Sequence, residues 1–187
     1  MVTLGDEKRK TLALIEELNP DSQYLTDDPD IQAKINPVVN MVMFELARLK
    51  KLPEYAEVPV TKGQLLRFGD IGKACGKEVY QLNTVRGVAH DLKAGGTIIK
   101  ALEDGTAEIE CFVYPTPITE DTGDEYEFEL SRDVLEIMPY GVAADLLKSD
   151  ESAEYGTVYA KRYEEMLQRL DPRYSLGEIS FEGGVVI

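Results

Sequence analysis

The chain has 187 residues, of which 43% are hydrophobic, and this supplies enough apolar side chains for one domain or one domain with an insertion. Its 35 Asp and Glu residues outnumber its 20 Lys and Arg residues and give a formal net charge of −15. Such a charge repels phosphate and argues against nucleic acid as a tightly held ligand, although DNA can still pass close by without being gripped.

The N-terminal residues and the cysteines lead us to expect a cytoplasmic protein. Residues 1–10 are charged and lack a signal-peptide core, and no run of about eighteen apolar residues occurs, so we expect a soluble protein with no membrane contact. Cys75 and Cys111 belong to no CxxC motif and have no histidine near them in the sequence. We therefore expect free, reduced thiols and neither a zinc site nor a disulfide.

Two helices are predicted before residue 52. The first covers residues 5–18 and stops at the turn formed by residues 19–21. The second begins at Asp28, a good N-cap that is followed by a proline in the first turn, and it runs to Lys50. Pro37 removes one backbone hydrogen bond, which predicts a kink in one helix and not two separate helices. One face of this helix is apolar, with Ile31, Ile35, Val38, Val42, Leu46 and Leu49.

From Leu52 the apolar residues alternate with a period of two, which is typical of strands. Glycine-rich turns separate the alternating segments, so we expect a small antiparallel sheet or barrel. The predicted strands cover residues 55–61, 78–83, 88–92, 97–101 and 107–114.

A dense acidic run follows these strands. Its spacing does not match a calcium-binding loop, so we expect no metal site and interpret the run as a solvated face. Tyr126, Phe128 and Leu130 alternate within it, which predicts a strand with one acidic side. The acidic residues are Glu120, Asp121, Asp124, Glu125, Glu127 and Glu129.

Two further helices are predicted after Ser131, a plausible N-cap. The first continues to Leu147 with a kink at Pro139, and the second ends at Pro172. The second carries a tyrosine every fourth residue, and we interpret the pair as an αα-hairpin that closes a core and also meets a neighbouring subunit through the tyrosines. These tyrosines are Tyr155, Tyr159 and Tyr163.

The last residues, 174–187, contain glycines and the apolar residues Ile179, Phe181, Val185 and Ile187, which predict a strand-forming arm that binds another subunit. The fold class expected for the whole chain is α+β. In this prediction residues 1–52 and 131–173 form a helical bundle from both chain ends, and residues 53–130 form an inserted small antiparallel β domain. An extended C-terminal arm completes the chain.

No catalytic signature emerges from the residues. His90 and Asp91 are neighbours on a predicted strand, so their side chains point to opposite faces and do not form a proton-transfer pair. We interpret residues 73–77 as an exposed loop, and the Gly-Gly pairs lack the remainder of a phosphate-binding motif. We therefore expect no enzyme, no catalytic residue and no cofactor. A hydrolase with a noncontiguous site stays open as a weaker alternative.

Two segments carry a resemblance to a known family. Residues 24–31 (YLTDDPDI), which enter a long helix, and residues 135–147 (LEIMPYGVAADLL), which precede the tyrosine-rich helix, are similar to parts of the head-to-tail connector (adaptor, or neck) proteins of tailed bacteriophages and prophages. The resemblance covers both helical parts, about half of the chain, and the β insertion is larger than in the all-helical members. It implies a structural virion protein, assembled in the bacterial host cytoplasm and located in the virion neck.

The same resemblance implies specific partners. The helical bundle would dock beneath the portal protein, about twelve copies would form a closed ring around the DNA channel, and arms would reach adjacent rings and a tail or stopper protein. On this interpretation the six acidic residues line the channel and repel passing DNA. A second hypothesis is a non-enzymatic protein-binding or regulatory module whose acidic β domain recognises a basic partner.

Overall fold

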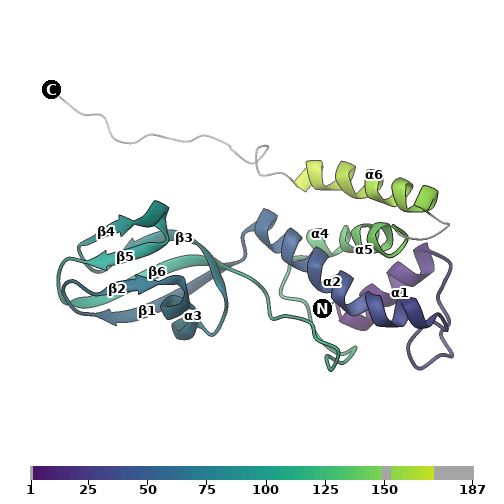
Figure 1. The fold of residues 1–187 in the computed structure, drawn as a ribbon, viewed down its shortest axis with the longest axis horizontal. Coiled ribbons are helices and arrows are strands. Elements are labelled where there is room, and N and C mark those ends of the chain that lie inside the picture. The colour runs from purple at the N-terminus through teal and green to yellow at the C-terminus, as the bar shows by residue number, and fades with distance from the viewer. Residues whose placement is uncertain (1, 149–152, 171–187) are drawn as a thin grey trace.

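The computed structural model describes residues 2–148 and 153–170. It is mixed α+β, with a helical part beside a β part that contains two three-stranded antiparallel sheets (Figure 1). The elements in chain order are α1 (Leu4–Leu14), α2 (Pro29–Lys50), β1 (Pro53–Val60), β2 (Leu65–Arg67), α3 (Phe68–Cys75), β3 (Val79–Arg86), β4 (His90–Lys93), the short 3-10 helix η1 (Ala94–Gly96), β5 (Ile98–Ala101), β6 (Gly105–Val113), α4 (Arg132–Leu135), α5 (Met138–Leu146) and α6 (Ala153–Leu170).

The starts of α1 and α2 follow from their caps. Thr3 and Asp6 form a capping box, in which each side chain accepts a hydrogen bond from the backbone of the other, at 3.2 and 3.1 Å. The Asp28 carboxylate accepts hydrogen bonds from the first free backbone amides of α2 at 2.8 and 3.3 Å, as predicted. Pro37 lies inside one continuous α2, also as predicted.

The helical part has one apolar core, in which α5 contacts α1, α2 and α6. The predicted inner face of α2 packs here and not on the sheets, with Ile35, Val42 and Leu46 at most 4% exposed. Fully buried side chains from the other elements complete the core, among them Leu4, Leu12, Val134, Met138 and Val142.

The single helix expected after Ser131 was a wrong prediction. The segment forms two helices, α4 and α5, which are separated by Glu136 and Ile137. Pro139 lies in the first turn of α5, where its missing amide hydrogen has no intrahelical acceptor to lose. The proline is therefore accommodated at a helix start and does not kink a longer helix.

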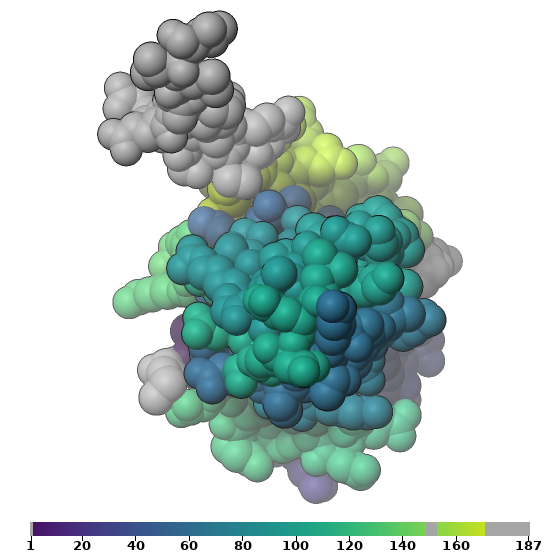
Figure 2. Space-filling model, turned by 90° about the vertical axis from the view of Figure 1, so that its left-hand side faces the viewer, coloured from purple at the N-terminus to yellow at the C-terminus, as the bar shows by residue number. Residues whose placement is uncertain are grey.

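The β part was predicted as one small antiparallel sheet or barrel and consists of two antiparallel sheets, with strand orders β1-β6-β3 and β2-β5-β4. The two sheets share a second apolar core, which is typical of a small β sandwich. Side chains from both sheets and from α3 meet in this core, among them Ala56, Val60, Leu66, Ile71, Ile99, Ile109 and Val113. We call residues 53–113 the β unit. Figure 2 looks at the molecule from the end that the β unit forms, with the helical part behind it.

Two elements of the β unit were missed in the sequence. β2 has only three residues, and α3 replaces part of the exposed loop that was expected at residues 73–77. The glycines of α3 lower its helix propensity, so the sequence does not predict a helix there. Gly72 is nevertheless required, because a Cβ at this position would lie 2.6 Å from the carbonyl oxygen of Lys77. The helix ends at Gly76, whose φ of 74° suits a left-handed cap.

The acidic segment does not form the strand that was predicted for residues 126–130. It makes one isolated bridge, between Thr3 and Glu127, and otherwise runs as a loop along the helical part. Ile118, Phe128 and Leu130 are buried in the helical core, although residues 53–130 were expected to form the β domain. These three apolar residues therefore pack with the helices and not with the sheets.

Candidate functional site

An aromatic cluster joins the β unit to the end of α2. The ring of Tyr114 lies 4.9 Å from the ring of Phe44 and 4.9 Å from the ring of Tyr80, measured between centroids. The Tyr80 hydroxyl donates to the backbone oxygen of Ala47 at 3.2 Å. Each such aromatic pair contributes on the order of 1 kcal/mol beyond the burial of its area, so the cluster favours one orientation of the two parts.

Lys77 adds a charged link at the same junction. Its ammonium group lies 3.2 Å from a carboxylate oxygen of Glu54 on β1, and it also donates to Glu129, which lies fifty-two positions further along the chain. Glu129 accepts two more hydrogen bonds from Thr116, at 3.0 Å from the backbone and 2.8 Å from the hydroxyl. Burial opposes ionisation of Glu129, but these donors outweigh it and lower the pKa of its carboxyl group.

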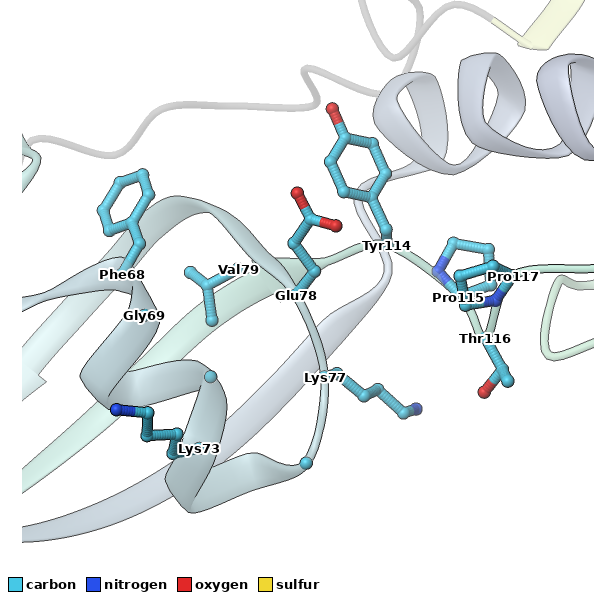
Figure 3. A pocket seen from close by; sticks show the side chains of 12 residues that line it. Phe68, Gly69, Lys73, Lys77, Glu78, Val79, Tyr114, Pro115, Thr116 and Pro117 are labelled. Carbon is cyan, nitrogen blue, oxygen red and sulfur yellow. The ribbon is translucent and has the colours of Figure 1, made fainter.

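A shallow groove lies between α3 and the segment that leaves β6 (Figure 3). It has a volume of about 590 Å³, with Phe68, Lys73 and Lys77 on the α3 side and Tyr114 and Thr116 on the other. The described residues that line it include no histidine and no cysteine, and the Thr116 hydroxyl is already bound to Glu129.

The three tyrosines of α6, which were predicted to share one role, have different environments. Tyr155 is 68% exposed and is available to a partner, whereas Tyr163 is 9% exposed and belongs to the helical core. The Tyr163 hydroxyl donates to Glu45 at 3.0 Å, and burial, assisted by Glu45, raises its pKa. Tyr159 donates to the backbone oxygen of Leu14. Val158, which is 64% exposed, joins Tyr155 on the outer face of α6.

The six acidic residues do not form one uniform face. Asp124 pairs with Lys8 at 2.8 Å and Glu129 with Lys77, so both hold the loop onto the rest of the chain. The other four are exposed and form no ion pair with another described residue. These four residues, Glu120, Asp121, Glu125 and Glu127, are called the free acids below. The expected arm residues Ile179, Phe181, Val185 and Ile187 lie outside the described residues.

The histidine and the buried thiol of the β unit have partners or environments of their own. His90 lies 3.0 Å from the backbone oxygen of Val88 through Nδ1, while Asp91 pairs with Lys93 at 3.1 Å, so His90 and Asp91 do not act on each other. Burial raises the pKa of the Cys111 thiol to about 11, which keeps it protonated at neutral pH. Within residues 2–148 and 153–170, no three acidic, histidine or cysteine side chains are grouped to hold a metal ion.

The outer faces of the two sheets carry charges that the sequence analysis missed. On the first sheet, Glu57, Glu108 and Glu110 point away from the core beside the exposed Tyr55. The signal was the alternation already used to predict the strands, because every second residue of a sandwich strand faces outward. Reading the outward positions together would have shown this acidic surface.

No protein-family model matches this chain, and no curated protein matches it. None of the described helices is both long enough and apolar enough to cross a bilayer.

Proposed function

We propose that this protein is a structural subunit of the head-to-tail connector of a tailed bacteriophage or prophage, an adaptor that forms a ring below the portal, joins capsid to tail and lets DNA pass. The observation that carries the proposal is the contact of α5 with α1, α2 and α6, which brings together helices from both ends of the sequence while the β unit lies to one side. This order of parts supports a helical layer that binds the portal and a separate β layer.

In this proposal residues 1–52 and 131–173 form the helical bundle, and residues 174–187 form an arm that binds an adjacent subunit or a tail or stopper protein. The exposed pair Tyr155 and Val158 supports a contact surface on α6, since aromatic residues are enriched where proteins bind one another. The resemblance implies about twelve copies in the ring, and a repeated head-to-tail contact is the kind of contact that closes such a ring.

The free acids support a channel through which DNA slides without binding. Repeated around a ring, four carboxylates per subunit repel the phosphate backbone from every side and keep the duplex centred. At physiological salt the Debye length is about 8 Å, so the repulsion acts only over the last few ångströms between protein and duplex. Lysine at these positions would hold the DNA instead.

The proposal is tested by neutralising the free acids with Glu120→Gln, Asp121→Asn, Glu125→Gln and Glu127→Gln. Folding and ring formation should persist, because all four side chains are exposed, while DNA retention or ejection in assembled particles should change. A matched control neutralises four other exposed acids, Glu16, Glu17, Asp21 and Glu154. Unchanged DNA retention with the first set, or tight binding of duplex DNA by the unaltered protein at about 150 mM salt, contradicts the proposal.

One observation favours the second hypothesis, a non-enzymatic module that recognises a basic partner. The acidic outer face of the first sheet is suited to bind a cationic protein surface. The molecular mass in solution separates the two functions, because such a module would be a monomer or dimer and a connector would form a larger ring.

A further inference from the structure

The first outward surface belongs to the sheet β1-β6-β3. In the antiparallel register of β1 and β6, Tyr55 lies opposite Glu110 and Glu57 lies opposite Glu108, while the residues between them point into the core. This places three carboxylates and one tyrosine on adjacent positions of one face. We call Tyr55, Glu57, Glu108 and Glu110 the acidic sheet face.

An aromatic side chain lies among these carboxylates. Tyr55 is 49% exposed, and its hydroxyl donates to Glu57 at 3.0 Å. Partial burial and the nearby Glu57, Glu108 and Glu110 raise the pKa of Tyr55, as a negative local potential requires. Two cations lie on the same side of this sheet: Arg86 on β3 is opposite Glu108, and the ammonium group of Lys51 lies 5.3 Å from the ring centroid of Phe112. The three carboxylates still outnumber them.

The second outward surface belongs to the sheet β2-β5-β4. Here Leu65, Lys100 and Asp91 form one row across the three strands, and Arg67, Ile98 and Lys93 form the next. Asp91 is paired with Lys93 at 3.1 Å, whereas Arg67 and Lys100 form no ion pair with another described residue. We call these six residues the basic sheet face.

The two faces lie on opposite sides of the β unit, because the inner faces of both sheets cover the same core. Each face also has an exposed apolar or aromatic side chain, Tyr55 at 49% and Leu65 at 47%. A large side chain surrounded by charged groups is the usual composition of a protein interface. One molecule thus carries two surfaces of opposite charge that point in opposite directions.

We propose that the acidic sheet face of one copy binds the basic sheet face of the next copy. This inference rests on the proposed ring and names the surfaces that would close it. Two identical faces would bring like charges together, which costs several kcal/mol, so the contact joins different faces of successive copies. Such a head-to-tail contact repeats from copy to copy and forms a ring when the rotation closes.

The partner is a second copy because the complementary surface is present on the same chain. The acidic sheet face has Glu57 and Glu108 facing outward, and the basic sheet face has Arg67 and Lys100 facing outward. The acidic sheet face shares no residue with the free acids. The free acids therefore remain available to line a channel.

Charge reversal tests the contact with two matched variants of the full chain. One carries Glu57→Lys with Glu108→Lys and the other carries Arg67→Glu with Lys100→Glu. Each variant alone should associate roughly 100-fold more weakly than the unaltered protein, because like charges then meet.

An equimolar mixture of the two variants should assemble again, since each variant supplies the charge that the other lost. A chain with all four changes should also assemble, and this rescue excludes misfolding as the cause. Sedimentation velocity gives the masses.

The control variant, Glu120→Lys with Glu127→Lys, reverses exposed acids outside both faces and should assemble normally. Rings formed by the unaltered chain and by both reversed variants would overturn the proposed contact while leaving the ring itself standing. A strictly monomeric unaltered chain would overturn the ring and the contact together. Normal rings with loss of binding to a basic protein by the first variant would assign the acidic sheet face to another partner.

Discussion

The ring of Tyr163 on α6 leaves no room for a side chain at Gly141 on α5. A Cβ at position 141 would lie 2.8 Å from Cε2 of Tyr163, which is closer than nonbonded carbon atoms approach. The same tyrosine donates its hydroxyl hydrogen to Glu45 on α2 at 3.0 Å. One side chain thus fixes the packing of three helices, and it does so from the core and not from a partner surface.

The substitution Gly141→Ala should therefore destabilise the fold by about 1 to 3 kcal/mol, because the new methyl group overpacks the site. Urea unfolding measures the loss. Gly69→Ala is the matched control, since nothing lies within 4 Å of the added Cβ and alanine favours the α3 helix by roughly 0.5 to 1 kcal/mol. Equal stability of the two variants would contradict the packing described for Tyr163.

Because Lys77 pairs with Glu129, the free energy of unfolding should decrease as the solution becomes acidic. The folded pKa of Glu129 is below its ordinary value of 4.5, so its contribution is present above that value and is lost as the pH falls through the folded pKa. Lys77→Met removes the main donor and should flatten the acid branch of unfolding free energy against pH. Lys34→Met, which breaks an exposed pair with Asp30 at 3.6 Å, is the control and should leave that branch unchanged.

The contribution of Glu7 to stability should change with pH in the opposite direction to that of Glu129. Burial raises its pKa despite the nearby Lys10, and its Oε2 atom has no hydrogen-bond partner among the described residues. A raised folded pKa stabilises the fold below the unfolded pKa, and this contribution is lost as the pH rises. Glu7→Gln should increase stability at pH 7 by on the order of 1 kcal/mol, as followed by chemical denaturation. Glu17→Gln, at an exposed site, should change stability by less than about 0.5 kcal/mol.

The exposed pair on α6 should affect assembly and not folding. Tyr155→Ser with Val158→Ser should weaken association with a portal or a second subunit by about tenfold, as for a typical interface residue. The melting temperature should stay close to that of the unaltered chain, because both side chains face outward. Lys161→Ser, a polar change on the same helix, should leave association intact. Unaltered binding in the double variant would remove α6 from the contact surface.

The sequence was most informative where local chemistry and periodicity agreed. α2 combines an aspartate cap, a proline in the first turn and a long apolar face, and its predicted bounds match the structure. The longer strands were also found, because alternation persists over their length. These features depend on neighbours in the chain and can therefore be seen without the fold.

The missed features depend on contacts between distant residues. β2 is too short for a periodic signal, and Gly72 of α3 is explained only by the close approach of the Lys77 carbonyl oxygen. The different roles of the acidic residues arise because Lys8 and Lys77 reach Asp124 and Glu129 across the fold. The spacing of these acids in the sequence does not distinguish those that form ion pairs from those that do not.

Electron microscopy of the purified full chain, with and without a portal protein, shows whether the chain forms a ring around a channel. We expect closed rings with a central opening and side views in which one ring stacks on the portal. A chain that remains strictly monomeric in the presence of its portal would contradict it.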